Sequence, residues 1–355
     1  MSNQKQEKIK VGITLGDAAG IGPEIIMKTF SDDRLFKHFT PIVFGNPRIF
    51  SFYKKVIEID KFQYSTVKNY QNLSNNSLNI FPVWNEEFAI NIGEPNKETG
   101  KYAFLSLKAT CEALEKNEID VLVTAPINKD VIHSDEFPFA GHTEYLQAFF
   151  SAKDSLMFLV TDEIKIGLVT NHVAIHDVAK NISKDKIIRK ISLMHQTLQE
   201  DFNIDKPKIA VLALNPYAGD NGVIGNEEKD IIYPAIQEAK NMNILAFGPY
   251  AADGFFASDN YKNFDGILAM YHDQGLIPFK YIAREDGINF TAGLNIIRTS
   301  PDHGTAENIA GKGIAEEASF RNAIYKAIDI YNNRINHFEM RSNPLEKIAQ
   351  FKEER

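Results

Sequence analysis

The sequence predicts an α/β fold, in which a mainly parallel sheet is covered by helices on both faces. Short apolar runs alternate along the chain with segments of helical spacing, and most of these runs end in glycine, proline or polar loops. The length agrees with this prediction, because 355 residues with 44% hydrophobic content can form about two domains with ordinary cores.

The first predicted strand covers residues 8–15 and leads into a glycine-rich turn at 16–24 (GDAAGIGPE). A helix follows, with Pro23 in its first turn, where the missing N–H costs nothing. The turn lacks the glycine spacing of a dinucleotide fingerprint and the Lys-Ser/Thr of a phosphate loop. We therefore expect a tight connection in which backbone approaches backbone or ligand, and we exclude an ordinary Rossmann or nucleoside-triphosphate loop.

The next elements continue the alternation of strands and helices. Residues 41–45 predict a second strand, followed by a helix with Asn46 as its cap and Pro47 in its first position. The polar stretch 61–96 is expected to be irregular. The single cysteine, Cys111, lies in an amphipathic helical segment, cannot form an internal disulfide, and is expected to fill the core.

The remainder of the chain has the same organisation. The helix that contains Cys111 is expected to end near residue 116, and a buried strand follows at 120–125. Further predicted elements are a helix at 144–150, a hairpin at 156–160 and 165–170, strands at 209–214, 244–247 and 266–270, a hairpin at 288–299 turning near Gly293, and a helix at about 316–331.

Composition excludes several classes of function. A formal charge of −8 argues against a nucleic-acid surface, which needs clustered Lys and Arg, although a small phosphate ligand needs only a few donors. No window approaches the ~20 apolar residues of a membrane span, and the polar first residues do not form a signal region. The protein is therefore expected to be cytoplasmic, with no membrane or nucleic-acid partner.

Polar residues gather in the loops that follow the apolar runs, and four of the nine histidines lie there: His142, His172, His272 and His303. In open α/β sheets, ligands bind outside the carboxyl ends of the strands. Neutral imidazole is a common metal ligand, so His172 and His272 could share one divalent ion if their strands are neighbours. The alternative for each is a hydrogen bond to a nearby backbone carbonyl.

Other polar residues suit an anionic substrate. Thr143 opens the predicted helix 144–150, whose first N–H groups could bind an anion or simply be capped. Lys280 and Arg298 could supply positive charge, or could be solvated cations. Asn289 lies in a strand-like segment, where asparagine is uncommon, so its amide needs a partner, and a substrate is one candidate.

Five motifs resemble, in order and spacing, those of the 4-hydroxythreonine-4-phosphate dehydrogenase family of pyridoxal 5′-phosphate biosynthesis. They are residues 16–24 (GDAAGIGPE), 141–144 (GHTE), 215–220 (NPYAGD), 271–275 (YHDQG) and 298–306 (RTSPDHGTA). The resemblance extends over about residues 11–327. It implies an isocitrate/isopropylmalate dehydrogenase-like fold with two α/β/α domains around a central cleft, here expected to be 1–129 plus 304–355 and 130–303.

The resemblance also implies a homodimer with sites at the subunit boundary, and NAD bound without the usual fingerprint. Substrate would bind His142, Thr143, Lys280, Asn289 and Arg298, NAD would bind His303, Gly304, Thr305 and Asn308, and one divalent ion (Zn, Mg or Co) would bind His172, His272 and the residue at position 217. His172, His272 and Lys280 are the expected catalytic residues.

The chain departs from the family pattern at the third metal position, where Tyr217 stands in place of histidine. A phenol is a poor ligand at neutral pH, because its reference pKa is about 10. The ion would then be held by two histidines plus water, substrate or a carboxylate such as Asp220, or it would be held weakly.

The reaction implied by the resemblance is NAD-dependent, metal-assisted oxidation of 4-phosphooxy-threonine to a β-keto acid, which decarboxylates to 3-amino-2-oxopropyl phosphate. Three alternatives remain open. The substrate could be another four-carbon phosphorylated hydroxy acid, such as a phosphothreonate or phosphoerythronate, because fold does not set specificity. The chain could instead be a phosphotransacetylase-like acyltransferase, or a ligand-binding homologue without activity.

Overall fold

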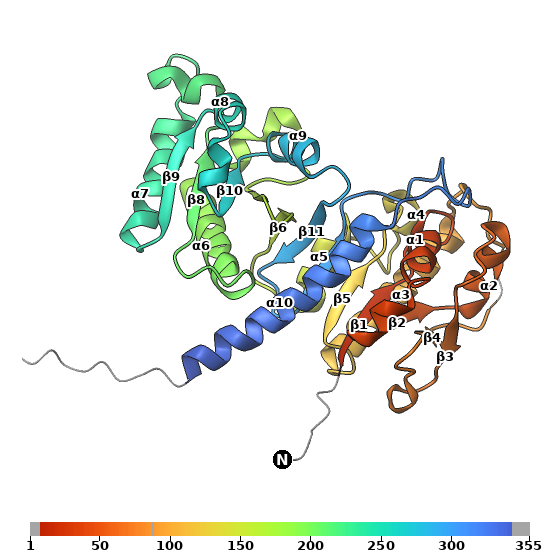
Figure 1. The fold of residues 1–355 in the computed structure, drawn as a ribbon. Coiled ribbons are helices and arrows are strands. Elements are labelled where there is room, and N and C mark those ends of the chain that lie inside the picture. The colour runs from red at the N-terminus through yellow and green to blue at the C-terminus, as the bar shows by residue number, and fades with distance from the viewer. Residues whose placement is uncertain (1–7, 87–88, 343–355) are drawn as a thin grey trace, which may run out of the picture.

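The structure, a computed structural model, describes residues 8–86 and 89–342 and confirms the predicted α/β fold. Twelve strands form one sheet in the order β3-β4-β2-β1-β5-β12-β11-β6-β7-β10-β8-β9. The two ends of this sheet lie in two lobes, each with its own helices (Figure 1).

The first lobe is built on parallel strands, as predicted. Its strands are β1 (Ile9–Thr14), β2 (Phe39–Gly45), β3 (Tyr64–Thr66), β4 (Leu78–Pro82) and β5 (Val121–Thr124), and its helices are α1 (Gly22–Thr29), α2 (Pro47–Val56), α3 (Lys97–Glu115) and α4 (Lys129–Ile132). The predicted cap of α2 is confirmed, since the Asn46 side chain accepts a hydrogen bond from the Arg48 N–H. Cys111 is fully buried in α3, also as predicted.

The prediction that residues 61–96 are irregular was wrong, because this stretch contains β3 and β4. Leu78 and Ile80 are fully buried on β4, but only one residue separates them and the fully buried residue between them is Asn79. Its amide donates to the carbonyl oxygens of Pro41, at 3.1 Å, and Ser74, at 2.9 Å. Because these carbonyl oxygens satisfy its amide, Asn79 can be buried in the strand. The polar residue interrupts the apolar pattern, so the short strand was not predicted from the sequence.

The second lobe contains the opposite end of the sheet. Its elements are β6 (Leu156–Val160), β7 (Lys165–Leu168), α6 (Lys184–Glu200), β8 (Lys208–Leu212), α7 (Tyr233–Asn241), β9 (Leu245–Tyr250), α8 (Ala252–Ala257), β10 (Gly266–Ala269) and α9 (His272–Ala283). Helix α5 (His142–Phe149) precedes them in the chain and packs on the first lobe, where Tyr145 contacts Phe104 of α3 with ring centroids 5.8 Å apart. The predicted β6–β7 hairpin is confirmed. Strand β10 pairs in parallel with both β7 and β8, so the loops after these three strands leave the sheet at the same edge.

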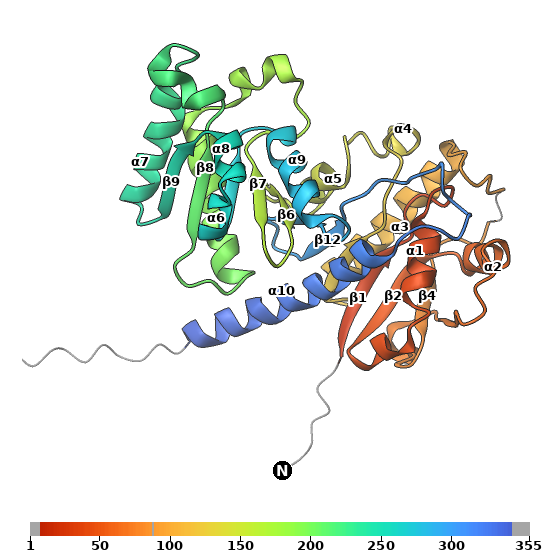
Figure 2. The same cartoon turned by 45° about the horizontal axis from the view of Figure 1, so that its top comes forward.

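A hairpin of β11 (Ile288–Ala292) and β12 (Arg298–Pro301) joins the two lobes, turning at Gly293 as predicted. Strand β12 pairs with β5 of the first lobe and β11 pairs with β6 of the second. Helix α10 (Ala318–Ser342) packs against this hairpin and against α1 and α6, and extends further than the predicted end at 331 (Figure 2).

The predicted domain boundaries stay a prediction, and their outer ends, 1–7 and 343–355, lie outside the described residues. Short helices complete the fold: η1 (Asp33–Lys37), η2 (Tyr70–Asn72), η3 (Ile175–Asp177), η4 (Ala179–Asn181), η5 (Pro216–Gly222), η6 (Glu228–Ile232) and η7 (Asn260–Asn263).

The glycine-rich turn at 16–24 is a tight connection, as predicted. The Ile21 N–H donates to the Thr305 carbonyl at 2.9 Å, and a Cβ added at Gly20 would lie 2.8 Å from that oxygen. The turn therefore packs directly on the loop that carries the predicted NAD-binding residues.

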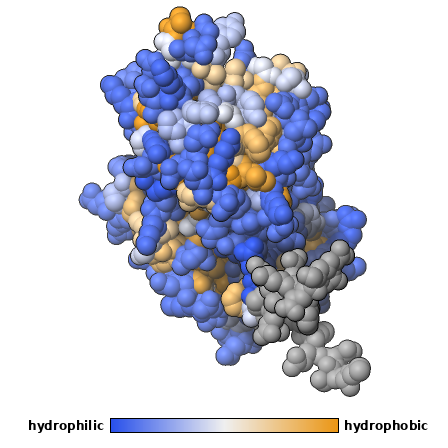
Figure 3. Space-filling view, turned by 90° about the vertical axis from the view of Figure 1, so that its left-hand side faces the viewer, coloured by the Kyte–Doolittle hydropathy of each residue, from blue (hydrophilic) through white to orange (hydrophobic). Residues whose placement is uncertain are grey.

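Over the described ranges, no helix has the length and hydropathy needed to cross a membrane. Figure 3 shows a face on which hydrophilic residues predominate and hydrophobic residues form separate patches.

Candidate active site

His172 and His272 lie side by side at the carboxyl edge of the sheet, with ring centroids 6.0 Å apart. His172 follows β7 and His272 begins α9 directly after β10, and these two strands are parallel neighbours. The loops are held together by Thr170, whose N–H and hydroxyl both donate to the Met270 carbonyl, at 3.2 and 2.7 Å. The fold thus brings together the two histidines that the sequence predicted as metal ligands.

The Nδ1 atom of each ring faces a carboxylate. In His272 it lies 2.7 Å from Asp273 Oδ1, and in His172 it lies 3.9 Å from Glu144 Oε1. Burial lowers the pKa of His172, and the positive charge of Lys129 lowers it further, against the opposing effect of Glu144. The ring is therefore kept in the neutral form, which is the form that binds metal ions.

A pocket of about 260 Å³ opens at this histidine pair. Its lining combines polar residues with an apolar wall: Asn171, His172, Val173, Ala174, Ile175, Val178, Tyr271, His272 and Asp273. A second pocket of about 680 Å³ shares Tyr271 and Asp273 with it and extends along α9 past Ile277 and Tyr281. Space for a ligand thus exists beside both rings.

Tyr217 lies on η5, after β8, and is 75% exposed. Residues 217–221 all have positive φ, and buried Glu228 holds the start of the loop by accepting from the Leu214 and Asn215 N–H groups, at 2.8 and 2.7 Å. Within the part of the chain that the structure describes, no three His, Cys, Asp or Glu side chains are grouped to hold a metal ion. Asp220 is therefore not a third ligand beside His172 and His272. The two imidazoles alone supply only part of the ligands that a divalent ion needs.

The predicted anion site is at the start of α5, which begins at His142 rather than after Thr143. Gly141 is the N-cap residue and contributes no side-chain hydrogen bond, so the first N–H groups of the helix are available to a ligand. Burial lowers the pKa of His142 well below its usual value, and Arg298 and Lys129 add to the shift. Among the described residues, its buried Nε2 atom has no hydrogen-bond partner.

Arg298 is buried at the start of β12, and it is not the solvated cation that was the alternative. Its guanidinium donates to the Thr124 hydroxyl, at 3.0 and 2.6 Å, and to the Thr291 hydroxyl, at 3.0 Å. Burial lowers the pKa of Arg298 to about 10, and the negative charge of Glu144 opposes this shift. A positive charge that has no hydrogen-bonded carboxylate among the described residues is thereby held near the start of α5.

Asn289 lies two residues before Thr291 on β11, so the two side chains point to the same face of the sheet. The Asn289 Oδ1 atom is buried and, among described groups, has no partner. Because Thr291 receives the Arg298 guanidinium, the amide and the guanidinium share that face. The sequence predicted that this amide needs a partner and that a substrate is one candidate, and for Oδ1 the substrate stays the candidate.

Lys280 lies two turns after His272 on α9, beside Asp302. Its Nζ donates to the Asp302 carbonyl at 3.3 Å and lies 3.8 Å from Asp302 Oδ2. Burial raises the pKa of Asp302, while Lys280 and His272 oppose the rise. The adjacent His303 bonds the Gly304 carbonyl through Nδ1, at 3.0 Å, and its buried Nε2 has no partner among the described groups.

The other predicted NAD-binding residues form the loop after His303. The Thr305 hydroxyl and the Asn128 amide both donate to Glu307 Oε1, at 2.6 and 2.7 Å, and these bonds lower the pKa of Glu307 although burial opposes them. Gly304 and Asn308 are exposed, and an added Cβ at Gly304 would meet no atom within 4 Å. The loop is thus bonded to the first lobe through Glu307 and Asn128, while there is free space beside Gly304 at its start.

Charged residues that were not among the predicted site residues connect these groups. Glu144 acts on both Arg298 and His172, and Asp302 lies in the fields of Lys280 and His272. Glu144 and Asp302 both lie in motifs already quoted, but only the fold shows which side chains they face. Lys129, which acts on His142 and His172, has no such signal in the sequence.

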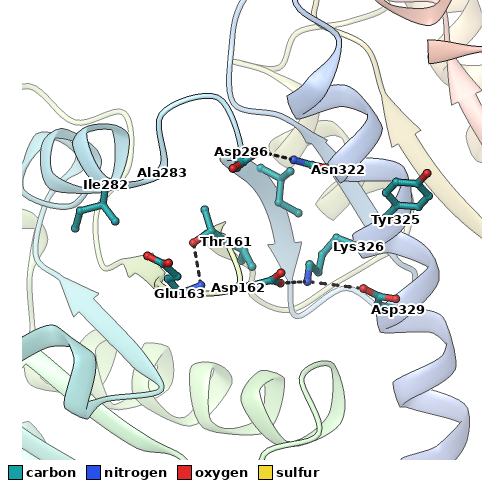
Figure 4. Close-up of a pocket in the computed structure, with 12 residues that line it drawn as sticks. Thr161, Asp162, Glu163, Ile282, Ala283, Asp286, Asn322, Tyr325, Lys326 and Asp329 are labelled. Atoms are coloured by element: carbon teal, nitrogen blue, oxygen red, sulfur yellow. Dashed lines mark hydrogen bonds and ion pairs between the residues drawn. The ribbon is translucent and has the colours of Figure 1, made fainter.

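Another pocket, of about 490 Å³, lies at the turn between β6 and β7 and beside α10 (Figure 4). Lys326 there pairs with Asp162 at 2.8 Å and Asp329 at 3.8 Å, and the Asn322 amide donates to Asp286. Its one lysine, Lys326, is thus paired with two of its carboxylates, and the pocket lies at the amino end of β7, opposite His172. None of the predicted site residues lines it.

Comparison with known proteins supports one family. A family model described as "Pyridoxal phosphate biosynthetic protein PdxA" matches residues 37–327. The 4-hydroxythreonine-4-phosphate dehydrogenase of Bacteroides thetaiotaomicron is 46% identical over 97% of this chain and 94% of its own length. A protein of Oceanobacillus iheyensis, 38% identical over 90% of this chain and 97% of its own, carries a provisional name that gives D-threonate 4-phosphate as its substrate. The crystal structure of 4-hydroxythreonine-4-phosphate dehydrogenase from Klebsiella pneumoniae matches 92% of this chain and 100% of its own, with a TM-score of 0.80 and 30% identity.

Proposed function

The chain belongs to the PdxA family of pyridoxal phosphate biosynthetic proteins, and from this we propose that it is a dehydrogenase of 4-phosphooxy-L-threonine, with NAD as the hydride acceptor. The substrate's secondary alcohol is oxidised, and the resulting β-keto acid loses carbon dioxide to give 3-amino-2-oxopropyl phosphate. The juxtaposition of His172 and His272, 6.0 Å apart at the carboxyl edge of the sheet, is the observation that carries the proposal.

The chain's own residues bind and orient the substrate. Arg298 and the uncapped start of α5 at His142 and Thr143 bind its anionic groups. Asn289 supplies a buried amide oxygen on the same face, and Lys280 supplies a further cation from α9. These groups come from separate elements of the fold, so together they fix the carbinol carbon in one orientation.

His172 and His272 would hold one divalent ion, with Tyr217 or a non-protein ligand completing the set. Such an ion acts as a Lewis acid that stabilises negative charge developing on the substrate oxygen. The neutral state of His172, favoured by burial, keeps a nitrogen lone pair available for it.

The NAD-binding surface is proposed to be the loop of His303, Gly304, Thr305 and Asn308. Its support is the open space around Gly304 and the anchoring of Thr305 through Glu307 and Asn128. We further propose a cytoplasmic homodimer with sites at the subunit boundary. The exposure of Ile277 (67%) and Tyr281 (85%), beside the site, supports a contact surface there.

The test is a steady-state assay of the purified chain with NAD and 4-phosphooxy-L-threonine, with Mg²⁺, Zn²⁺ or Co²⁺ added in turn. NADH formation that a chelator stops and the metal restores is the expected result. Formation of acetyl-CoA from acetyl phosphate, without NADH, would show the acyltransferase alternative instead. Binding of the substrate without turnover, under every metal, would show a ligand-binding homologue.

A second candidate substrate, D-threonate 4-phosphate, is favoured by the name of the Oceanobacillus iheyensis relative. It differs from 4-phosphooxy-threonine at the amino group, so the same residues would serve both. A kcat/KM for D-threonate 4-phosphate at least equal to that for the amino acid would change the substrate and leave the reaction class unchanged.

A further inference from the structure

We propose that Thr124 is a positioning residue, whose buried hydroxyl orients the Arg298 guanidinium toward an oxyanion of the substrate, a phosphate or a carboxylate. The inference rests on the proposed function, because it concerns the same candidate substrate site. It assigns a role to a neutral side chain that was not among the predicted site residues.

The pairing of the strands places a threonine on each side of Arg298. Strand β12 lies between β5 and β11 in the sheet. In the parallel register with β5, Arg298 stands opposite Leu122, and Thr124 lies two residues further along β5, on the same face. The antiparallel register with β11, continued by one residue, sets Thr291 opposite Arg298. The two hydroxyls therefore flank the arginine side chain on one face of the sheet.

Three hydrogen bonds hold the guanidinium, and Thr124 accepts two of them. The Nε and Nη2 atoms of Arg298 donate to the Thr124 hydroxyl, at 3.0 and 2.6 Å, and Nη1 donates to the Thr291 hydroxyl, at 3.0 Å. Because the guanidinium is planar and rigid, one oxygen that accepts from both Nε and Nη2 fixes the orientation of the whole group. Removal of the Thr124 hydroxyl would leave a single contact, at Nη1, about which the group can turn.

The donors that remain define what the guanidinium binds. Each terminal nitrogen of arginine carries two N–H groups, and Nη1 and Nη2 of Arg298 each use one of them in the bonds to threonine. One N–H is left on each of these neighbouring nitrogens. Such a pair fits two oxygens of one phosphate or carboxylate, which is the two-pronged contact that arginine forms with these anions.

The use of hydroxyls as acceptors keeps the positive charge available. Thr124 and Thr291 are fully buried and neutral, so they orient the cation without neutralising it. The negative charge of Glu144 acts on Arg298, but within the described residues no hydrogen bond joins the two side chains. Burial also strengthens each hydrogen bond, because the surroundings screen it less than water does. The two remaining N–H groups are therefore left for a substrate oxyanion.

The experiment measures the affinity of the full chain for two probes, inorganic phosphate and L-threonine, by titration calorimetry, so that no turnover is needed. Thr124→Val keeps a side chain of similar shape without the hydroxyl, and it is expected to weaken binding of a probe about 10–100-fold, the effect of losing one charge-assisted hydrogen bond. Thr124→Ser keeps the hydroxyl and is expected to retain most of the affinity. The probe whose affinity falls shows whether Arg298 binds the phosphate or the carboxylate.

The matched control is Thr299→Val. Thr299 is a fully buried threonine next to Arg298 on β12, and its hydroxyl donates to the Ala323 carbonyl at 2.7 Å. Its side chain points to the other face of the sheet, so the affinity for both probes should stay unchanged. Thermal unfolding checks the fold of each variant, and Thr124→Ala replaces Thr124→Val if the valine variant does not fold.

Affinities of Thr124→Val equal to those of Thr299→Val, for both probes, would overturn the proposal. A serine variant as weak as the valine variant would also overturn it, since packing of the threonine methyl group, and not its hydroxyl, would then explain the effect. Binding of neither probe by the parent chain would show that the remaining N–H pair is not an oxyanion site, with the same consequence. NADH formation by the parent chain is measured separately, so its failure alone would count against the proposed function only.

Discussion

Replacement of Arg298 by methionine should greatly reduce activity while leaving the protein about as stable as before. Methionine keeps an unbranched apolar stem in place of the arginine stem but removes the guanidinium, with its charge and its donors. The side chain is only 3% exposed, so the substitution acts inside the candidate site and not on the surface.

The magnitude of the activity loss follows from counting donors. Arginine has five N–H donors, and three are used in the bonds to Thr124 and Thr291. The remaining two can bind an anionic group of the substrate, and a hydrogen bond from a charged donor contributes about 1.5–3 kcal/mol. Loss of two such bonds, about 3–6 kcal/mol, corresponds to a fall in kcat/KM of about 10²–10⁴.

Opposing effects determine the change in stability. Removing a buried cation that has no hydrogen-bonded carboxylate saves several kcal/mol of desolvation. The Thr124 and Thr291 hydroxyls lose their partner, at a cost of about 1–3 kcal/mol each. The two effects nearly cancel, so the free energy of unfolding should stay within about 2 kcal/mol of the parent.

The assay combines urea unfolding with steady-state NADH formation, and Thr291→Val serves as the control, since it removes one Arg298 contact and keeps the cation. A large loss of stability with near-normal kcat/KM would refute the reasoning, because Arg298 would then be a structural residue.

Three further predictions follow from the site. His272→Ala should abolish metal-dependent turnover and Co²⁺ binding without changing the thermal unfolding temperature, and near-normal activity would remove its metal role. Tyr217→His should tighten Co²⁺ binding if the phenol only replaces a lost ligand, because histidine tolerates the positive φ of 52° there; weaker binding would give Tyr217 its own function. The pKa values of His142 and His303 are lowered in the folded protein, mainly by burial. Their contribution to stability is therefore present above the unfolded value of about 6.5 and is lost as pH falls through the folded values. Urea unfolding between pH 7.5 and 5.5 should show this loss, and His303→Gln should reduce it.

The fold was predictable wherever one periodic signal dominated. The alternation of β1, α1, β2 and α3 follows from apolar runs and helical spacing, and Asn46 with Pro47 marks the start of α2. Strand β4 was missed because buried Asn79 obscures its apolar pattern. The end of α10 was placed too early, at residue 331. The helix continues to Ser342, and in this added part Arg334 forms an ion pair with buried Asp201 of the second lobe at 2.5 Å, a contact that the local sequence does not indicate.

The residues of the site were easier to predict from the sequence than the distances and contacts between them. A histidine after an apolar run is visible in the sequence, so His172 and His272 could be named from it. Their 6.0 Å separation requires β10 to insert between β7 and β8, and strand order is not encoded in local periodicity. Glu144 and Lys129 depend on the same tertiary information. For this reason the sequence gives candidates for the chemistry, while only the fold gives their partners.

The distribution of unpartnered polar atoms gives a separate argument for the site. Buried polar atoms without a partner cost about 1–3 kcal/mol each, and folded chains contain few of them. His142 Nε2, Asn289 Oδ1 and His303 Nε2 are three of the seven such side-chain atoms among the described residues, and all three belong to residues predicted to bind substrate or NAD. A ligand that forms the missing hydrogen bonds would remove this unfavourable free energy. Substrate and NAD bound together should therefore stabilise the folded chain more than a ligand that contacts only exposed side chains. A rise in the thermal unfolding temperature that is lost in Asn289→Leu, with the fold retained, would identify the amide as one of the groups that the ligand satisfies.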